Sequence, residues 1–100
     1  MFDNVLAALN EALHDWGMMQ KTEGDEGAEW AEIFERHFYV FIDEFESWLL
    51  NLDNQPTTLE KAEKLKEVEK IQDKLPAPLQ LNFSMELERI IDGLESTRFD

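Results

Sequence analysis

Residues 28–53 decide the fold of this chain, and they read AEWAEIFERHFYVFIDEFESWLLNLD. Apolar and aromatic side chains recur in this segment at intervals of three and four. They are Trp30, Ile33, Phe34, His37, Phe38, Phe41, Phe45, Trp48, Leu49 and Leu52. This spacing places them on one face of a helix, so we expect a long amphipathic helix over residues 28–53. Residues 37–42 alone would also suit a strand, but the helical stripe continues on both sides of them.

A second helix is expected before this segment, over residues 3–20. Its apolar residues are Val5, Leu6, Leu9, Leu13, Trp16 and Met19, again mostly three and four apart. Asp3 or Asn4 would serve as its N-cap, because a short side-chain oxygen can accept from the amides of the first turn. Residues 21–27 hold two glycines and three acids with no apolar residue, so they predict a surface turn.

Two more helices are expected after the long segment, over residues 57–75 and 78–97. Thr57 and Glu60 have the spacing of a capping box, and the prolines at 76 and 78 separate the two helices. The first stripe holds Leu59, Ala62, Leu65, Val68, Ile71 or Gln72, and Leu75; the second holds Leu79, Phe83, Leu87, Ile90, Ile91 and Leu94. Residues 79–83 also alternate like a strand, but a lone strand would have nothing to pair with.

Four amphipathic helices with short connections predict an all-α fold, an antiparallel four-helix bundle with a long second helix. We expect residues 1–100 to form one domain. The long helix exceeds the first in length, which leaves two interpretations open. Either one end of it projects and offers an aromatic surface for self-association, or it is curved and covered by its neighbours.

Composition excludes several classes of function. The chain has 23 acidic and 9 basic residues, a formal net charge of −14, while 43% of its residues are hydrophobic, enough for a folded core. Such a charge disfavours direct binding to nucleic acid or to an anionic membrane. Without cysteine there is no disulfide, thiolate zinc site or thiol nucleophile. No stretch has the length and apolarity of a membrane helix, and residues 1–10 carry an acid but no base, so we expect a cytoplasmic protein without a signal peptide.

The acidic residues are concentrated in the first half of the chain. Residues 1–55 carry a net charge of −11, whereas acids and bases balance in residues 56–75, a segment to which we assign no function. Opposite the apolar stripe of the long helix lies a face that is typical of a binding site for a basic protein. Its candidate partner-binding residues are Glu32, Glu35, Tyr39, Asp43 and Glu46. The other interpretation is that these acids only keep the surface soluble.

Residues that could carry chemistry are few. Glu11 and His14 have the Glu-x-x-His spacing of di-metal bundles, but the sequence holds no second copy. His37 lies on the apolar stripe, where a histidine is typically partly buried and hydrogen-bonded to a neighbour. The serines lack a glycine-flanked elbow, and the carboxylates sit on convex helix faces. We therefore expect no catalytic residues, no metal, no cofactor and no enzymatic activity.

Two functions from different classes follow from these patterns. The first is a small acidic module that binds a basic protein, for example a nucleic-acid-binding protein, as an inhibitor, antidote or nucleic-acid mimic. Carboxylates on a helix can reproduce a run of phosphates, which speeds encounter and blocks a site without chemistry. The alternative is a structural or adaptor subunit that associates through its aromatic long helix, either with a partner or with a second copy as a homodimer.

Overall fold

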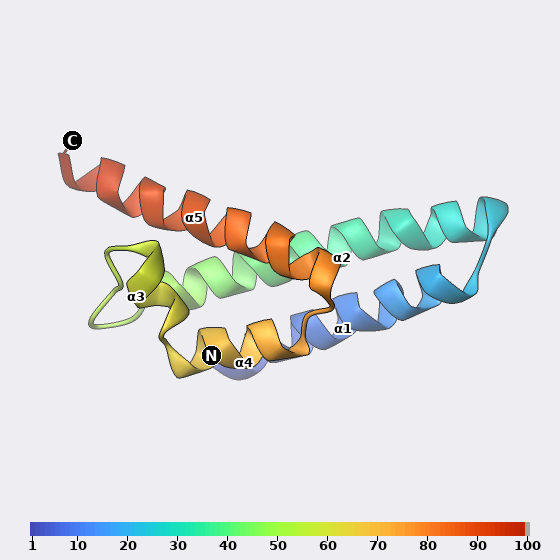
Figure 1. The fold of residues 1–100 in the computed structure, drawn as a ribbon, viewed down its shortest axis with the longest axis horizontal. Coiled ribbons are helices and arrows are strands. Elements are labelled where there is room, and N and C mark those ends of the chain that lie inside the picture. Colours follow the sequence, from blue (N-terminus) through green and yellow to red (C-terminus); the bar gives the residue numbers. More distant parts are fainter. Residues whose placement is uncertain (100) are drawn as a thin grey trace. The chain divides into compact units, whose positions relative to one another are not determined.

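A computed structural model describes the backbone of residues 1–99 and the side chains of residues 1–93. Every regular element in this part of the chain is a helix, so the predicted all-α class is confirmed. The helices are α1 (Phe2–Lys21), α2 (Gly24–Leu50), α3 (Leu59–Glu63), α4 (Lys66–Lys74) and α5 (Ala77–Phe99) (Figure 1). Contacts within the chain divide them into two compact units, residues 1–51 and residues 52–100.

The first unit is an antiparallel hairpin of α1 and α2 (Figure 1). The predicted turn over residues 21–27 is shorter than expected, because α2 begins at Gly24 and only Thr22 and Glu23 connect the helices. The Thr22 hydroxyl donates a hydrogen bond of 2.9 Å to the carbonyl oxygen of Met18, which satisfies one backbone acceptor at the end of α1. Gly24 has a φ of 63°, a conformation that L side chains rarely adopt.

The buried face of α1 differs from the one predicted. The buried residues of α1 are Val5, Ala8, Leu9, Ala12 and Asp15. Leu13, Trp16 and Met19, which were expected in the core, are only half-buried. The small alanine side chains allow the two helix backbones to approach closely, so the larger residues flank the contact instead of filling its centre. The spacing of apolar residues predicted the position of this helix correctly. It predicted the wrong buried face, because the stripe was defined by the larger side chains.

The long second helix is confirmed, and residues 37–42 are helical within it, but it begins at Gly24 and ends at Leu50, so Leu52 of the expected stripe lies beyond its end. Its core lies in the half away from the turn, where Phe41, Phe45 and Leu49 are fully buried. At that end the rings of Phe2 on α1 and Trp48 on α2 have centroids 5.0 Å apart. Nearer the turn, Trp30, Ile33 and Phe34 are half-buried. The aromatic stripe is therefore covered unevenly along its length.

In the second unit, the helix expected over residues 57–75 is two helices, α3 and α4. The first of them ends at Glu63 with Lys64 as its C-cap, and Leu65 has extended backbone angles, φ −65° and ψ 136°. No glycine or proline marks this break, so the local sequence gives no signal for it. The N-cap is Thr58 rather than Thr57: its hydroxyl accepts a hydrogen bond of 3.2 Å from the backbone N–H of Lys61. The N-cap of α1 is likewise Met1, not Asp3 or Asn4.

The corner at Pro76 joins α4 to α5. The side-chain amide of Gln80 donates to the carbonyl oxygens of Gln72 and Leu75, at 3.1 Å each, and so satisfies acceptors that the end of α4 leaves exposed. Residues 79–83 are helical, not a strand. The expected stripe of α5 is buried at Leu79, Phe83, Leu87, Ile90 and Ile91. The side chain of Leu94 lies outside the described residues.

Across the helices that the structure describes, none combines the length and apolarity needed to cross a bilayer.

Gly24 and Gly17 provide a matched test of the hairpin turn. Replacing Gly24 with alanine should lower the free energy of unfolding by about 1 kcal/mol, because a Cβ is strained at positive φ. Gly17 lies inside α1, and a Cβ there would meet no atom within 4 Å beyond its chain neighbours and the backbone of its own helix, so Gly17→Ala should raise the free energy of unfolding by about 0.5–1 kcal/mol. Urea denaturation measures both. Equal stability of Gly24→Ala and wild type would contradict the described turn.

Candidate protein-binding site

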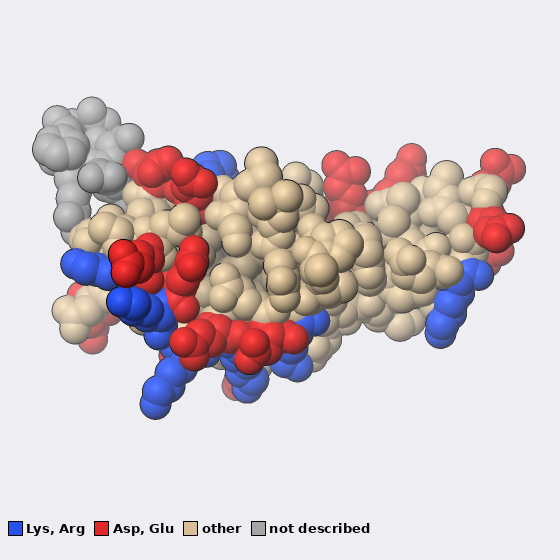
Figure 2. Space-filling view, viewed as in Figure 1, with Lys and Arg blue, Asp and Glu red and all other residues tan. Residues whose placement is uncertain are grey.

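The five predicted partner-binding residues lie on α2, at positions that follow the helical repeat. Glu32, Glu35, Tyr39 and Asp43 are exposed, with 49% of the Tyr39 surface accessible, whereas Glu46 is half-buried. We call the exposed four the acidic face. Figure 2 shows acidic side chains along the edge of the hairpin that α2 forms near the turn. Whether this face binds a partner stays a prediction.

The carboxylates of the acidic face have little basic charge around them on α2. Within the part of the chain whose side chains are described, no basic group forms an ion pair with Glu32, Glu35 or Asp43. Arg36 is the one base of α2, and it is exposed. Like charges three or four residues apart on a helix repel each other modestly, so a cationic partner would relieve this repulsion.

The ring of Tyr39 packs against the buried ring of Phe38. The two rings meet edge-on, with centroids 5.9 Å apart, and Phe38 is 5% exposed. Phe38 in turn contacts Phe34 and Phe41, at centroid distances of 5.6 and 5.7 Å. An aromatic residue supported in this way can add contact area with little loss of side-chain freedom, as dominant interface residues do.

Sequence reasoning missed Asp15, the one buried charged residue among the described side chains. Its Oδ2 lies 2.5 Å from Nδ1 of His37, so α1 and α2 are joined across the hairpin. When the Asp15 side chain is a carboxylate it only accepts hydrogen bonds, and the Nδ1–H of His37 is then the donor. Nδ1 of His14 lies 3.5 Å from the other oxygen, Oδ1. A signal did exist: Asp15 follows Ala8 and Ala12 at helical spacing, on the face that proves to be buried.

His37 is partly buried and hydrogen-bonded to a neighbour, as its position on the stripe predicted. Its side chain is 27% exposed, and its Nε2 lies 3.5 Å from Oε1 of Glu11, a mostly exposed carboxylate. Glu11 and His14, the two residues of the metal-like spacing, thus face different groups, and the His14 ring meets Trp30 edge-on at 5.9 Å. Among the described residues, no three His, Asp or Glu side chains are grouped to hold a metal ion.

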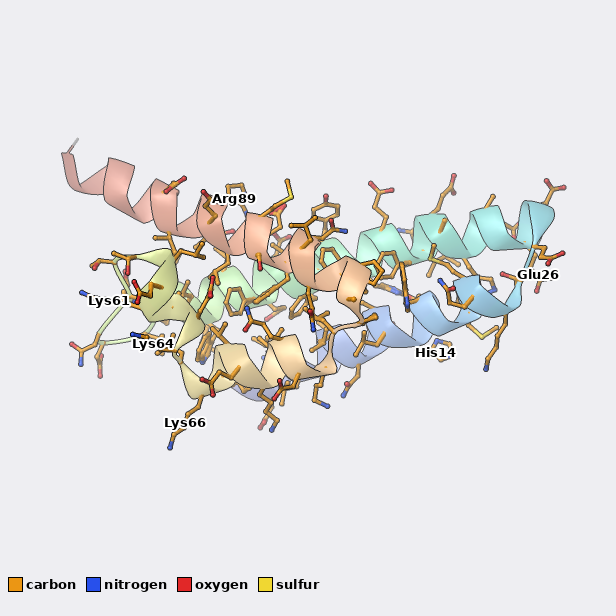
Figure 3. The ribbon with its side chains drawn as sticks, viewed as in Figure 1. His14, Glu26, Lys61, Lys64, Lys66 and Arg89 are labelled. Atoms are coloured by element: carbon orange, nitrogen blue, oxygen red, sulfur yellow. The ribbon has the colours of Figure 1, made fainter. Side chains whose placement is uncertain are left out.

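Charge is distributed differently in the two units. Residues 1–51 carry twelve acids and two bases, a net charge of −10, and residues 52–100 carry eleven acids and seven bases, a net charge of −4. Lys61, Lys64 and Lys66 extend outward from α3 and the start of α4 (Figure 3). Lys64 pairs with Glu60 at 3.5 Å, in a contact exposed enough to add little stability. The strongly acidic surface therefore belongs to the hairpin.

Comparisons of the sequence with protein families and curated proteins, and of the structure with solved structures, found no significant match.

The Asp15–His37 contact can be tested by a double-mutant cycle. His37→Leu leaves a buried carboxylate without its closest donor, so the free energy of unfolding should fall by about 2 kcal/mol, less than for a fully buried pair because His37 is partly exposed. The double variant with Asp15→Leu should lose less than the sum of the two single variants, because the buried charge is then removed as well.

Glu11→Gln is the matched control for this cycle. Glu11 also faces His37 but is mostly exposed, so its replacement should change the free energy of unfolding by less than about 0.5 kcal/mol. Thermal and urea denaturation of the four variants give the coupling energy. Strictly additive losses at Asp15 and His37 would show that the two side chains do not interact.

Proposed function

We propose that this chain is a small acidic protein-binding module that occupies a basic surface on another protein. One observation carries the proposal: an exposed tyrosine on α2 lies among exposed carboxylates that have no cationic partner within the described residues. Acidic surfaces of this kind accelerate encounter with a basic protein and disfavour acidic competitors.

The mode of action that fits this surface is steric and electrostatic. Carboxylates along a helix present a row of negative charges, so the module would act as an inhibitor, an antidote or a nucleic-acid mimic. A nucleic-acid-binding protein is the partner class that such charge suits best. In this role Tyr39 supplies apolar contact area, and Glu32, Glu35, Asp43 and Glu46 supply charge.

The proposal involves no enzymatic reaction, no metal and no cofactor, and no direct contact with nucleic acid or membrane. A cytoplasmic location stays part of the proposal. For the arrangement of the helices, the antiparallel four-helix bundle within a single domain stays our proposal, with α3 and α4 together in the place of the third helix.

A second candidate function is a structural or adaptor subunit that associates through the aromatic residues of α2. The half-buried state of Trp30, Ile33 and Phe34 favours it, because large apolar side chains that a chain covers incompletely are typical of association surfaces. In this interpretation the protein forms a homodimer or docks a partner through an apolar interface.

Salt dependence and one double variant distinguish the two functions. The immobilised protein should retain a basic protein from an extract at low salt and release it at moderate salt, because exposed charges are screened. Tyr39→Ala combined with Asp43→Lys should weaken retention at least about tenfold, since both the aromatic contact and the local charge are lost.

The control is Leu81→Ala combined with Glu69→Lys, which makes the same kind of change at exposed positions of the second unit and should leave retention intact. If both double variants retain the basic protein as well as wild type does, the acidic face does not bind it. Retention that salt leaves unchanged would favour the apolar interface instead.

A further inference from the structure

Near the turn, the two helices of the hairpin share a continuous apolar surface. Its members are Leu13 and Trp16 on α1 and Ala31 and Phe34 on α2, all half-buried. The rings of Trp16 and Phe34 have centroids 5.4 Å apart, so the surface crosses from one helix to the other. Leu13 and Ala31 each precede one of these rings by three residues and lie beside it on the same helix. We call these four residues the hairpin-end surface.

The hairpin-end surface exists because of what fills the centre of the helix contact. Ala12 and Asp15 are the buried residues of α1 in this region, and neither is large. Leu13 and Trp16 therefore lie along the flank of the contact, where they form an apolar strip with Ala31 and Phe34 of α2. A third helix can pack on two antiparallel helices along such a strip, in the manner of a helix bound in a groove.

The borders of this strip differ in charge. On the α2 side, Glu35 follows Ala31 by four residues, and Glu32 and Tyr39 of the acidic face come next around the helix. On the α1 side, the residues beside Leu13 and Trp16 are Asn10, Gly17 and Gln20, none of them charged. Figure 2 shows an uncharged area over the hairpin near its turn, with acidic side chains along the edge that α2 forms.

We propose that the hairpin-end surface and the acidic face together bind an amphipathic helix of a basic partner. The apolar stripe of that helix lies on Leu13, Trp16 and Phe34, and its lysines or arginines lie along the edge that faces Glu32 and Glu35. This proposal depends on the proposed function and specifies it, since it identifies the structural element and the charge pattern that the basic partner presents.

Charge complementarity favours a basic helix over a second copy of the chain as the occupant of the strip. Residues 1–51 carry a net charge of −10, so two hairpins packed through this strip would bring like charges together. A basic helix supplies both the apolar area and the opposite charge. The two contributions differ in their response to salt, because screening weakens the ion pairs but not the apolar contact.

Synthetic peptides test the proposal directly. The first probe is a helical peptide of leucine and lysine about 18 residues long, with its leucines on one face. The second has the same composition in scrambled order, and the third is oligolysine of equal charge. Calorimetry with the full chain at low salt should give a dissociation constant for the amphipathic peptide that is at least about tenfold lower than for the scrambled peptide. Amide resonances of residues 13–17 and 31–35 should shift on its addition.

A matched pair of variants assigns the apolar contribution. Leu13→Gln with Trp16→Gln should raise the dissociation constant of the amphipathic peptide to that of the scrambled one and leave oligolysine binding unchanged. Leu81→Gln with Met85→Gln makes the same change at exposed apolar residues of α5 and should have no effect. If the first variant does not fold, the resonance shifts of wild type decide: shifts centred outside the hairpin end would overturn the proposal.

The remaining outcomes separate this proposal from the proposed function. Equal affinity for the amphipathic and scrambled peptides, with both weakened by Tyr39→Ala and Asp43→Lys, would overturn the helix-binding strip and keep the acidic face as the site. Absence of binding to all three peptides at low salt would overturn both proposals. A wild-type dimer in sedimentation that Leu13→Gln with Trp16→Gln converts to monomer would show that a second copy occupies the strip.

Discussion

A buried carboxylate constrains the hairpin more than any other single group. Asp15 lies between the helices, where an ionised group is tolerated only with a donor within hydrogen-bonding distance, and His37 of α2 supplies that donor. The pair fixes which turn of α2 faces which turn of α1. Sliding either helix by one turn would separate them and leave the charge without its partner. We expect this polar contact to favour one alignment of the two helices, because an apolar side chain can exchange one apolar neighbour for another more easily than a buried charge can lose its donor.

That alignment determines what α2 presents to solvent. With His37 held against α1, Phe41 and Phe45 are directed into the core and Glu32, Tyr39 and Asp43 into solvent. The same helix thus supplies much of the core of its unit and the acidic surface proposed to bind a partner. A change in the rotation of α2 would alter both at once. The small residues of α1 have a comparable dual effect, since Ala12 permits close packing and thereby leaves Trp16 at the flank.

Much of the fold could be predicted, because the spacing of apolar residues along the chain indicates which segments form helices. The stripe from Trp30 to Leu49 is long enough that even five consecutive strand-forming residues do not interrupt the helix. The break at Leu65 could not be predicted, because no local residue requires it. Of the candidate site, exposure of Tyr39 followed from the helical repeat, but the role of Asp15 did not. A stripe defined by large apolar residues leaves out alanine and aspartate. Residues of these two types occupy the centre of the contact between α1 and α2.

The division of the chain into two units also divides its chromophores. All three tryptophans and the single tyrosine lie within residues 1–51, on α1 and α2, and the second unit absorbs near-ultraviolet light only through phenylalanine. Intrinsic fluorescence therefore follows the environment of the hairpin alone, whereas far-ultraviolet circular dichroism sums the helices of both units. Comparison of the two signals therefore distinguishes unfolding of the hairpin from unfolding of the whole chain, without any label.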